Sequence, residues 1–148
     1  MQDRSILLVE DNPDDEALTL RALDKGKVKN KIIVVRDGQE ALDYVYSQDK
    51  YAKRAEDFLQ LVLLDLKLPK VDGLEVLKKI RQYEKTKYLP VVILTSSKEE
   101  KDLVAGYCGG ANSYIVKPVD MEQFTEAVQQ LQLYWLVLNE ILRPSDFS

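Results

Sequence analysis

The chain has 148 residues, of which 45% are hydrophobic and 31% charged, and its formal net charge is −4. This length fits one domain, residues 1–148, with a core of its own, and the charge balance gives no reason to expect nucleic-acid binding. The single cysteine, Cys108, excludes an internal disulfide and fits a reducing cytosol. Because no apolar run approaches membrane-spanning length and the first residues do not resemble a signal peptide, we expect a soluble cytoplasmic protein with no membrane partner.

The sequence contains no histidine. This absence removes the usual general base, the commonest metal ligand and any phosphohistidine. A metal site would therefore be built from oxygen atoms, which favours Mg²⁺, Ca²⁺ or Mn²⁺.

Short apolar runs alternate with amphipathic helical stretches along the chain. The first predicted strand covers residues 5–10, and a helix follows with Asn12 as its N-cap and Pro13 at its first position. A second strand over residues 31–36 precedes a second helix that begins near residue 37. The polar residues from about 48 to 60 are interpreted as a helix extension plus a loop.

The second half of the chain continues the same alternation. Strands are predicted over residues 61–65, 89–95 and 113–117, and helices are predicted to begin near residues 71, 96 and 120. Gly109 and Gly110 supply a helix stop. Five strand–helix units with nearly continuous apolar strands predict an α/β, doubly wound domain whose five-stranded parallel sheet is covered on both faces.

Charged and hydroxyl residues follow the predicted strands at their carboxyl ends, where ligands bind in such sheets. They are Glu10 and Asp11 after the first strand, Asp65 after the third, Thr95 after the fourth and Lys117 after the fifth. Each one alone has an ordinary explanation, such as a helix cap, a turn residue or a solvated lysine. Together they predict three carboxylates, a hydroxyl and an ammonium group at one edge.

This set of groups suits phosphoryl chemistry. Clustered carboxylates repel one another and bind a divalent cation through oxygen. An aspartate carboxylate such as that of Asp65 can attack phosphorus and form an aspartyl phosphate. The phosphoryl oxygens then need partners such as the cation, Lys117, Thr95 and backbone N–H groups.

At these residues the sequence resembles the receiver domain of two-component response regulators, over about residues 5–135. The resemblance is carried by LLVEDN, LLDLKLPKVDG, VILTSS and ANSYIVKP, in this order, together with the alternating strand–helix pattern. It implies a flavodoxin-like (βα)5 receiver fold with strand order 2-1-3-4-5 and an extended last helix. It also implies that the chain receives a phosphoryl group from a sensor histidine kinase and is not an enzyme acting on an external substrate.

The resemblance implies roles for the acidic residues and for one neighbour. Asp65 is the phosphoacceptor. Asp11 holds Mg²⁺ (or Mn²⁺) directly, together with Asp65, and Glu10 does so largely through water. The backbone carbonyl of Lys67 is a further metal ligand, so the side-chain type matters little at that position.

The resemblance also implies a switch. Thr95 contacts the phosphoryl group, and Tyr114 swings inward when Thr95 moves; the alternative is that Tyr114 is an ordinary strand aromatic. Lys117 pairs with the phosphate, and the peptide bond from Lys117 to Pro118 is expected to be cis.

A narrower resemblance links the chain to stand-alone regulators that are paired with bacterial phytochromes, especially cyanobacterial ones. It is carried by VEDNPDD, the long segment before the third strand, LPVVILTSS, KPVDMEQF and LYWLVLNEIL. The last of these segments is apolar almost all round, and such a helix needs a second partner. We therefore expect a homodimer that involves Tyr134, Trp135 and Leu138; the alternative is that the segment folds back on its own core.

The same residues bear on three other functions. Phosphatases of the haloacid dehalogenase type carry a second acid two residues after the nucleophile, where this chain has Lys67. A flavin-binding module of similar fold needs a phosphate loop that is not acidic, unlike EDNPDDEA. A phosphorylation-independent interaction or dimerisation module usually lacks one of the acidic pair, the acceptor or the lysine, all of which are present here, and it remains the alternative.

Overall fold

The computed structural model describes residues 4–25, 30–48, 58–95, 105, 108–116 and 122. One parallel sheet contains five strands, namely β1 (Arg4–Val9), β2 (Lys31–Val35), β3 (Phe58–Leu64), β4 (Val91–Thr95) and β5 (Ser113–Val116). Within these described residues the chain forms the helices α1 (Pro13–Lys25), α2 (Gly38–Val45) and α3 (Gly73–Gln82). The strand order is β2-β1-β3-β4-β5, which confirms the predicted flavodoxin-like receiver topology.

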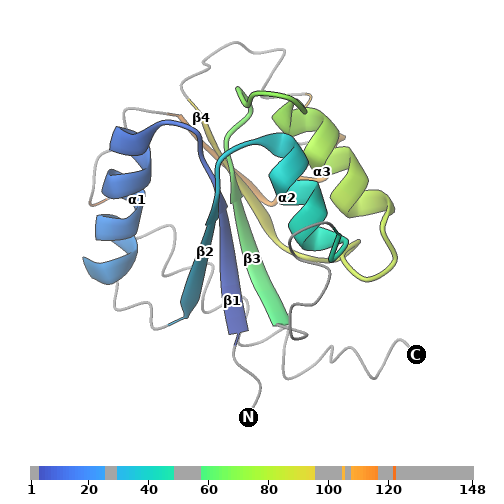
Figure 1. Ribbon diagram of the computed structural model, residues 1–148, viewed down its shortest axis with the longest axis horizontal. Helices are drawn as coiled ribbons and strands as arrows, with labels where there is room; N and C mark the ends of the chain where they lie inside the picture. Colours follow the sequence, from blue (N-terminus) through green and yellow to red (C-terminus); the bar gives the residue numbers. More distant parts are fainter. Residues whose placement is uncertain are drawn as a thin grey trace.

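Helices cover both faces of the sheet, as predicted (Figure 1). Successive residues of a strand point to opposite faces, and β1, which has a neighbouring strand on each side, shows this clearly. Its Leu7 and Val9 pack in a buried cluster with residues of α2 and α3, whereas its Ile6 and Leu8 pack in a second cluster with residues of α1. Because both faces are buried, the strands read as the continuous apolar runs seen in the sequence.

An Asn or Asp residue caps the start of each of these helices. Asn12 Oδ1 accepts hydrogen bonds from two backbone N–H groups of the first turn of α1, at 2.9 and 3.1 Å, and Pro13 takes the first helical position, as predicted. Asp37 and Asp72 cap α2 and α3 through their Oδ1 atoms at 2.7 and 2.9 Å. These caps satisfy N–H groups that have no partner inside the helix, and they fix the residue at which each helix begins.

The start of β3 differs from the prediction, which placed residues 58–60 in a helix extension or loop. The strand begins at Phe58, and its pairing with β1 shifts by one residue, so that Ser5 lies opposite Leu59 and Ile6 opposite Leu61. Gln60 is the additional residue at this irregularity, and its buried Oε1 accepts a hydrogen bond from Asn30 Nδ2. A buried polar residue in the strand therefore interrupted the apolar pattern on which the prediction depended.

The second half of the chain is described only in part. Ala105 and Cys108 are helical, the Gly109 N–H donates to the Ala105 carbonyl at 2.8 Å, and Gly110 has a φ of 99°, as expected of the predicted helix stop. The predicted last helix, with Tyr134, Trp135 and Leu138, lies outside the described residues except for Glu122, which is helical. Among the helices that the structure describes, none is long and apolar enough to cross a membrane.

Candidate functional site

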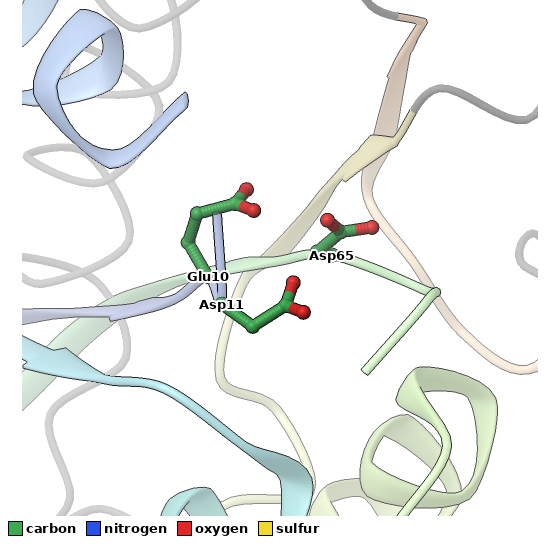
Figure 2. A group of neighbouring side chains, drawn as sticks. All are labelled: Glu10, Asp11 and Asp65. Atoms are coloured by element: carbon green, nitrogen blue, oxygen red, sulfur yellow. The ribbon is translucent and has the colours of Figure 1, made fainter. Parts of the chain in front are cut away.

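Three acidic side chains meet at the carboxyl edge of the sheet (Figure 2). Glu10 and Asp11 directly follow β1, and Asp65 directly follows β3, which is the neighbour of β1 in the sheet. One carboxylate oxygen from each residue lies within 4.8 Å of the other two. We call these three residues the acidic cluster; they are the three carboxylates that the sequence predicted to lie at one edge.

The backbone of the sheet fixes where the acidic cluster stands. The Glu10 N–H donates to the Val35 carbonyl at 3.0 Å, and the Asp65 N–H donates to the Val9 carbonyl at 3.1 Å. The sheet pairing thus continues one residue past the ends of β1 and β3. Both acidic residues therefore have a fixed main chain, while their side chains reach the edge of the sheet.

The two buried members of the acidic cluster each accept a hydrogen bond from a nearby backbone N–H group. Glu10 Oε1 accepts from the Asn12 N–H at 3.2 Å, and Asp65 Oδ1 accepts from the Lys67 N–H at 3.1 Å. Glu10 and Asp65 are 1% and 7% exposed, whereas Asp11 is exposed. These backbone bonds orient the buried carboxylates, and Asp11 leaves the cluster open to solvent.

The acidic cluster fits a divalent cation. Three carboxylates this close repel one another, which favours a positive charge among them. Carboxylate oxygen is the ligand type that Mg²⁺ and Mn²⁺ prefer, and Mg²⁺ usually keeps several waters beside one or two protein carboxylates. The exposure of Asp11 provides the open side that such a hydrated ion needs.

The loop that follows Asp65 packs closely against the start of α3. The Gly73 N–H donates to the Leu66 carbonyl at 3.0 Å. A Cβ atom added at Gly73 would lie 2.3 Å from the Asp65 carbonyl oxygen and 2.5 Å from Leu66 Cα. Sequence reasoning assigned Gly73 no role, because this close approach depends on how the loop folds.

The other residues predicted for the site are placed only in part. Thr95 ends β4, which neighbours β3, so its backbone lies at the same edge as Asp65. Tyr114 lies in β5, is half-buried and packs against the core on the face that α2 and α3 cover. Lys117 and Pro118 lie outside the described residues, as does the side chain of Thr95. The contacts of Lys117 and Thr95 with phosphate stay predictions. The cis peptide bond before Pro118 and the movement of Tyr114 also stay predictions.

The carbonyl of Lys67 was predicted to be a further metal ligand. The Lys67 side chain is exposed, and its backbone N–H is the group that contacts Asp65. This residue therefore acts on the acidic cluster through its main chain, and ligation by its carbonyl stays a prediction.

Comparison with known proteins identifies a family and several relatives. The family model of the response regulator receiver domain matches residues 6–129. The chain is 39% identical to the probable methanogenesis regulatory protein FilR2 of Methanothrix harundinacea, over 95% of this chain and 88% of that protein. It is 37% identical to the response regulator Rcp1 of Synechocystis sp., over 88% of each chain.

Solved structures agree with these matches. The bacteriophytochrome response regulator AtBRR is 51% identical, with a TM-score of 0.78, over 91% of this chain and 96% of that one. The phosphorylated cyanobacterial phytochrome response regulator RcpA is 38% identical, with a TM-score of 0.77, over 90% and 94%. Rcp1 has also been solved in an Mn²⁺-bound form, with a TM-score of 0.76, over 89% and 94%. The chain therefore belongs to the response regulator receiver domain family.

Proposed function

We propose that this chain is a single-domain response regulator that accepts a phosphoryl group on Asp65 from the phosphohistidine of a sensor histidine kinase. The observation that carries the proposal is the acidic cluster, in which a carboxylate at the tip of a central strand has two others within 4.8 Å. Family membership supports phosphorylation-based signalling, and RcpA is a relative that has been solved in a phosphorylated form.

The acidic cluster provides the nucleophile for the transfer of the phosphoryl group from the kinase. A carboxylate oxygen of Asp65 attacks phosphorus, the bond from phosphorus to the kinase histidine breaks, and its electron pair returns to the imidazole nitrogen. Asp11, Glu10 and Asp65 would hold Mg²⁺, which would offset the negative charge of the carboxylates and of the phosphoryl oxygens. The Lys67 N–H holds the Asp65 carboxylate in a fixed orientation, which lowers the entropy cost of the attack.

Lys117, Thr95 and Tyr114 are the remaining predicted residues; the first two bind the phosphoryl group, and Tyr114 responds to it. Lys117 and Thr95 contact its oxygens, and the movement of Thr95 draws Tyr114 inward. Tyr114 packs against the core, so its movement would change the surface that a partner meets. The chain carries out only its own phosphorylation and dephosphorylation, because Lys67 stands where an acid would be needed for turnover of another substrate.

We further propose that the kinase is a bacterial phytochrome and that the regulator acts in the cytoplasm as a homodimer. The partner assignment is supported by AtBRR, which is described as a bacteriophytochrome response regulator, and by RcpA, which is described as a cyanobacterial phytochrome response regulator. The relative FilR2 is described as a probable methanogenesis regulatory protein. Because relatives of similar identity have different described roles, the partner must be tested directly.

Phosphotransfer from a purified phytochrome kinase tests the partner. The kinase is first autophosphorylated with labelled ATP and then mixed with the chain or with Asp65→Asn. The label should pass from the phytochrome kinase to the wild-type chain, and Asp65→Asn should stay unlabelled. An unrelated labelled kinase, incubated with the wild-type chain for the same time, should keep its label. If the label stays on the phytochrome while acetyl phosphate labels Asp65, the phytochrome partner is wrong and the receiver function stands.

The alternative function is an interaction module that works without phosphorylation. The acidic cluster argues against it, since a pure scaffold has no need for three carboxylates that repel one another. A folded chain that takes no phosphoryl group under conditions that label another receiver would favour this alternative.

A further inference from the structure

Residues 35–38 link β2 to α2, and sequence reasoning gave them no role. We call them the corner segment. At its first residue, the Val35 carbonyl accepts the hydrogen bond from Glu10 N–H at 3.0 Å. At its second residue, Arg36 Nη2 lies 3.2 and 3.3 Å from the two carboxylate oxygens of Glu16, in the first turn of α1. The corner segment therefore holds both the first acidic residue and the helix that follows the acidic pair.

The other two residues of the corner segment contact the loop that follows the phosphoacceptor. Asp37 Oδ2 lies 3.5 Å from Lys70 Nζ. The Gly38 N–H donates to the Pro69 carbonyl at 3.2 Å. A Cβ atom added at Gly38 would lie 1.9 Å from the Val71 carbonyl oxygen, which is far inside van der Waals contact. A glycine is thus required for the start of α2 to lie against this loop.

The contacted part of the loop has a strained backbone. Lys70 has a φ of 68°, and the Val71 N–H donates to the Pro69 carbonyl across it at 2.8 Å. A three-residue turn with positive φ at its centre is rare and strained, and lysine does not relieve the strain as glycine would. Strained conformations persist where the surroundings over-determine them, and they cluster at functional sites. Here the surroundings that hold the turn are Asp37 and Gly38.

The strained turn is joined to the acidic cluster by a short chain of contacts. Lys67, three residues before Lys70, donates its N–H to Asp65 Oδ1 at 3.1 Å. On the far side, the Gly73 N–H donates to the Leu66 carbonyl at 3.0 Å. The loop is therefore fixed at the start of α3 and at the start of α2, and the N–H that orients Asp65 lies within it.

We infer that the corner segment is a positioning element that sets the geometry of the acidic cluster from both sides, with Gly38 as its main residue. It touches neither the phosphoryl group nor the metal. It acts through the Val35 carbonyl on Glu10 and through Asp37 and Gly38 on the loop that holds Asp65. This inference rests on the proposed phosphoryl transfer at Asp65, because the geometry that it controls is that of the acceptor.

The test is the Gly38→Ala variant, with Gly110→Ala as the matched control. Gly110 lies in the turn before β5, at the opposite edge of the sheet, and a Cβ there would meet the Arg81 side chain at 2.7 Å with φ at 99°. Both variants should lose stability. Only Gly38→Ala should lower the rate of labelling by acetyl phosphate and the affinity for Mn²⁺, each by about tenfold. The control should stay within about twofold of wild type in both, since it does not reach the acidic cluster.

The outcomes separate this inference from the proposed function. A folded Gly38→Ala chain that labels and binds Mn²⁺ like wild type overturns the inference alone. Equal losses in Gly38→Ala and Gly110→Ala also overturn it, because stability would then explain the effect. A wild-type chain that takes no phosphoryl group overturns the proposed function, and the inference falls with it.

A second pair of variants tests the positioning role of the corner segment if Gly38→Ala does not fold. Asp37→Asn keeps the cap of α2, whereas Asp37→Ala removes the oxygen that accepts the Glu40 N–H at 2.7 Å. Asparagine and aspartate are nearly equal as N-caps, so Asp37→Asn isolates the loss of the charge that faces Lys70 Nζ at 3.5 Å, and both Asp37→Asn and Asp37→Ala should label about threefold more slowly than wild type. Equal labelling rates of Asp37→Ala and wild type would overturn the inference.

Discussion

Asp11 is the exposed member of an acidic cluster whose other two members, Glu10 and Asp65, are buried. Replacing Asp11 by asparagine removes one negative ligand, and we expect affinity for Mn²⁺ to fall by at least about tenfold, measured by titration calorimetry. Without metal the same change relieves repulsion, so the free energy of unfolding should not fall. The control is Asp14→Asn, an exposed acid in the first turn of α1. Equal loss of affinity in both variants would show that the effect is one of overall charge.

Arg81 lies away from the acidic cluster, and its contribution to stability can be tested by a single substitution. Its guanidinium donates to the Leu89 carbonyl at 2.6 Å, to the Gly110 carbonyl at 2.7 and 2.9 Å and to Asn112 Oδ1 at 3.1 Å. Burial lowers the pKa of this guanidinium from its usual value. Arg81 therefore joins the end of α3 to the turns before β4 and β5.

We predict that Arg81→Met lowers the free energy of unfolding by about 1–3 kcal/mol, because partly buried carbonyls lose their donors. Urea denaturation measures this, and Lys78→Met, at an exposed position of the same helix, should stay within about 0.5 kcal/mol of wild type. Matching midpoints for Arg81→Met and wild type would mean that water replaces these donors without cost.

At the scale of elements, α3 is held to the sheet by fully buried side chains, and Leu77 is 0% exposed. We predict that Leu77→Ala costs about 2–5 kcal/mol of unfolding free energy, through lost burial and the cavity left behind. The matched control is Leu18→Ala on α1, where the side chain is 38% exposed, and it should cost much less. Denaturation curves that are shifted equally would contradict the packing of α3 as described.

The elements also show what the sequence could and could not predict. The succession of strands and helices and most of their boundaries followed from apolar runs and helix caps such as Asn12, because each is a local signal. The strand order, which is not local, came from the family resemblance. The start of β3 was missed, since Gln60 is satisfied by Asn30, a partner thirty residues away. The corner segment was missed for the same reason. Gly38 is needed because a Cβ atom there would clash with the Val71 carbonyl oxygen. No local sequence pattern predicts a contact between segments so far apart in the chain.

The candidate site was more predictable than these contacts. In a parallel sheet every strand delivers its carboxyl end to one edge, so the order of the elements alone brings Asp65 beside Glu10 and Asp11. What the pattern could not supply was orientation. The backbone N–H of Lys67 on Asp65 and the close approach of Gly73 depend on how the loop folds.

At the scale of the whole molecule, we predict that the chain is a homodimer formed through its last helix. Light scattering should give twice the chain mass of 17.0 kDa, and the triple variant Tyr134→Ala, Trp135→Ala, Leu138→Ala should give the monomer mass, because truncating large aromatic and aliphatic side chains removes the anchors of an interface. A wild-type monomer, both with and without acetyl phosphate, would contradict this assembly.

The central claim is that Asp65 accepts a phosphoryl group in a metal-dependent reaction. The most direct measurement is the intact mass of the chain after incubation with acetyl phosphate and Mg²⁺, beside an Asp65→Asn variant, an EDTA-treated sample and another receiver as a labelling control. We predict one added phosphoryl group on the wild-type chain and none on the variant or the EDTA-treated sample. A folded wild-type chain that gains no mass while the other receiver is labelled, or an Asp65→Asn chain that gains the group, would contradict the account.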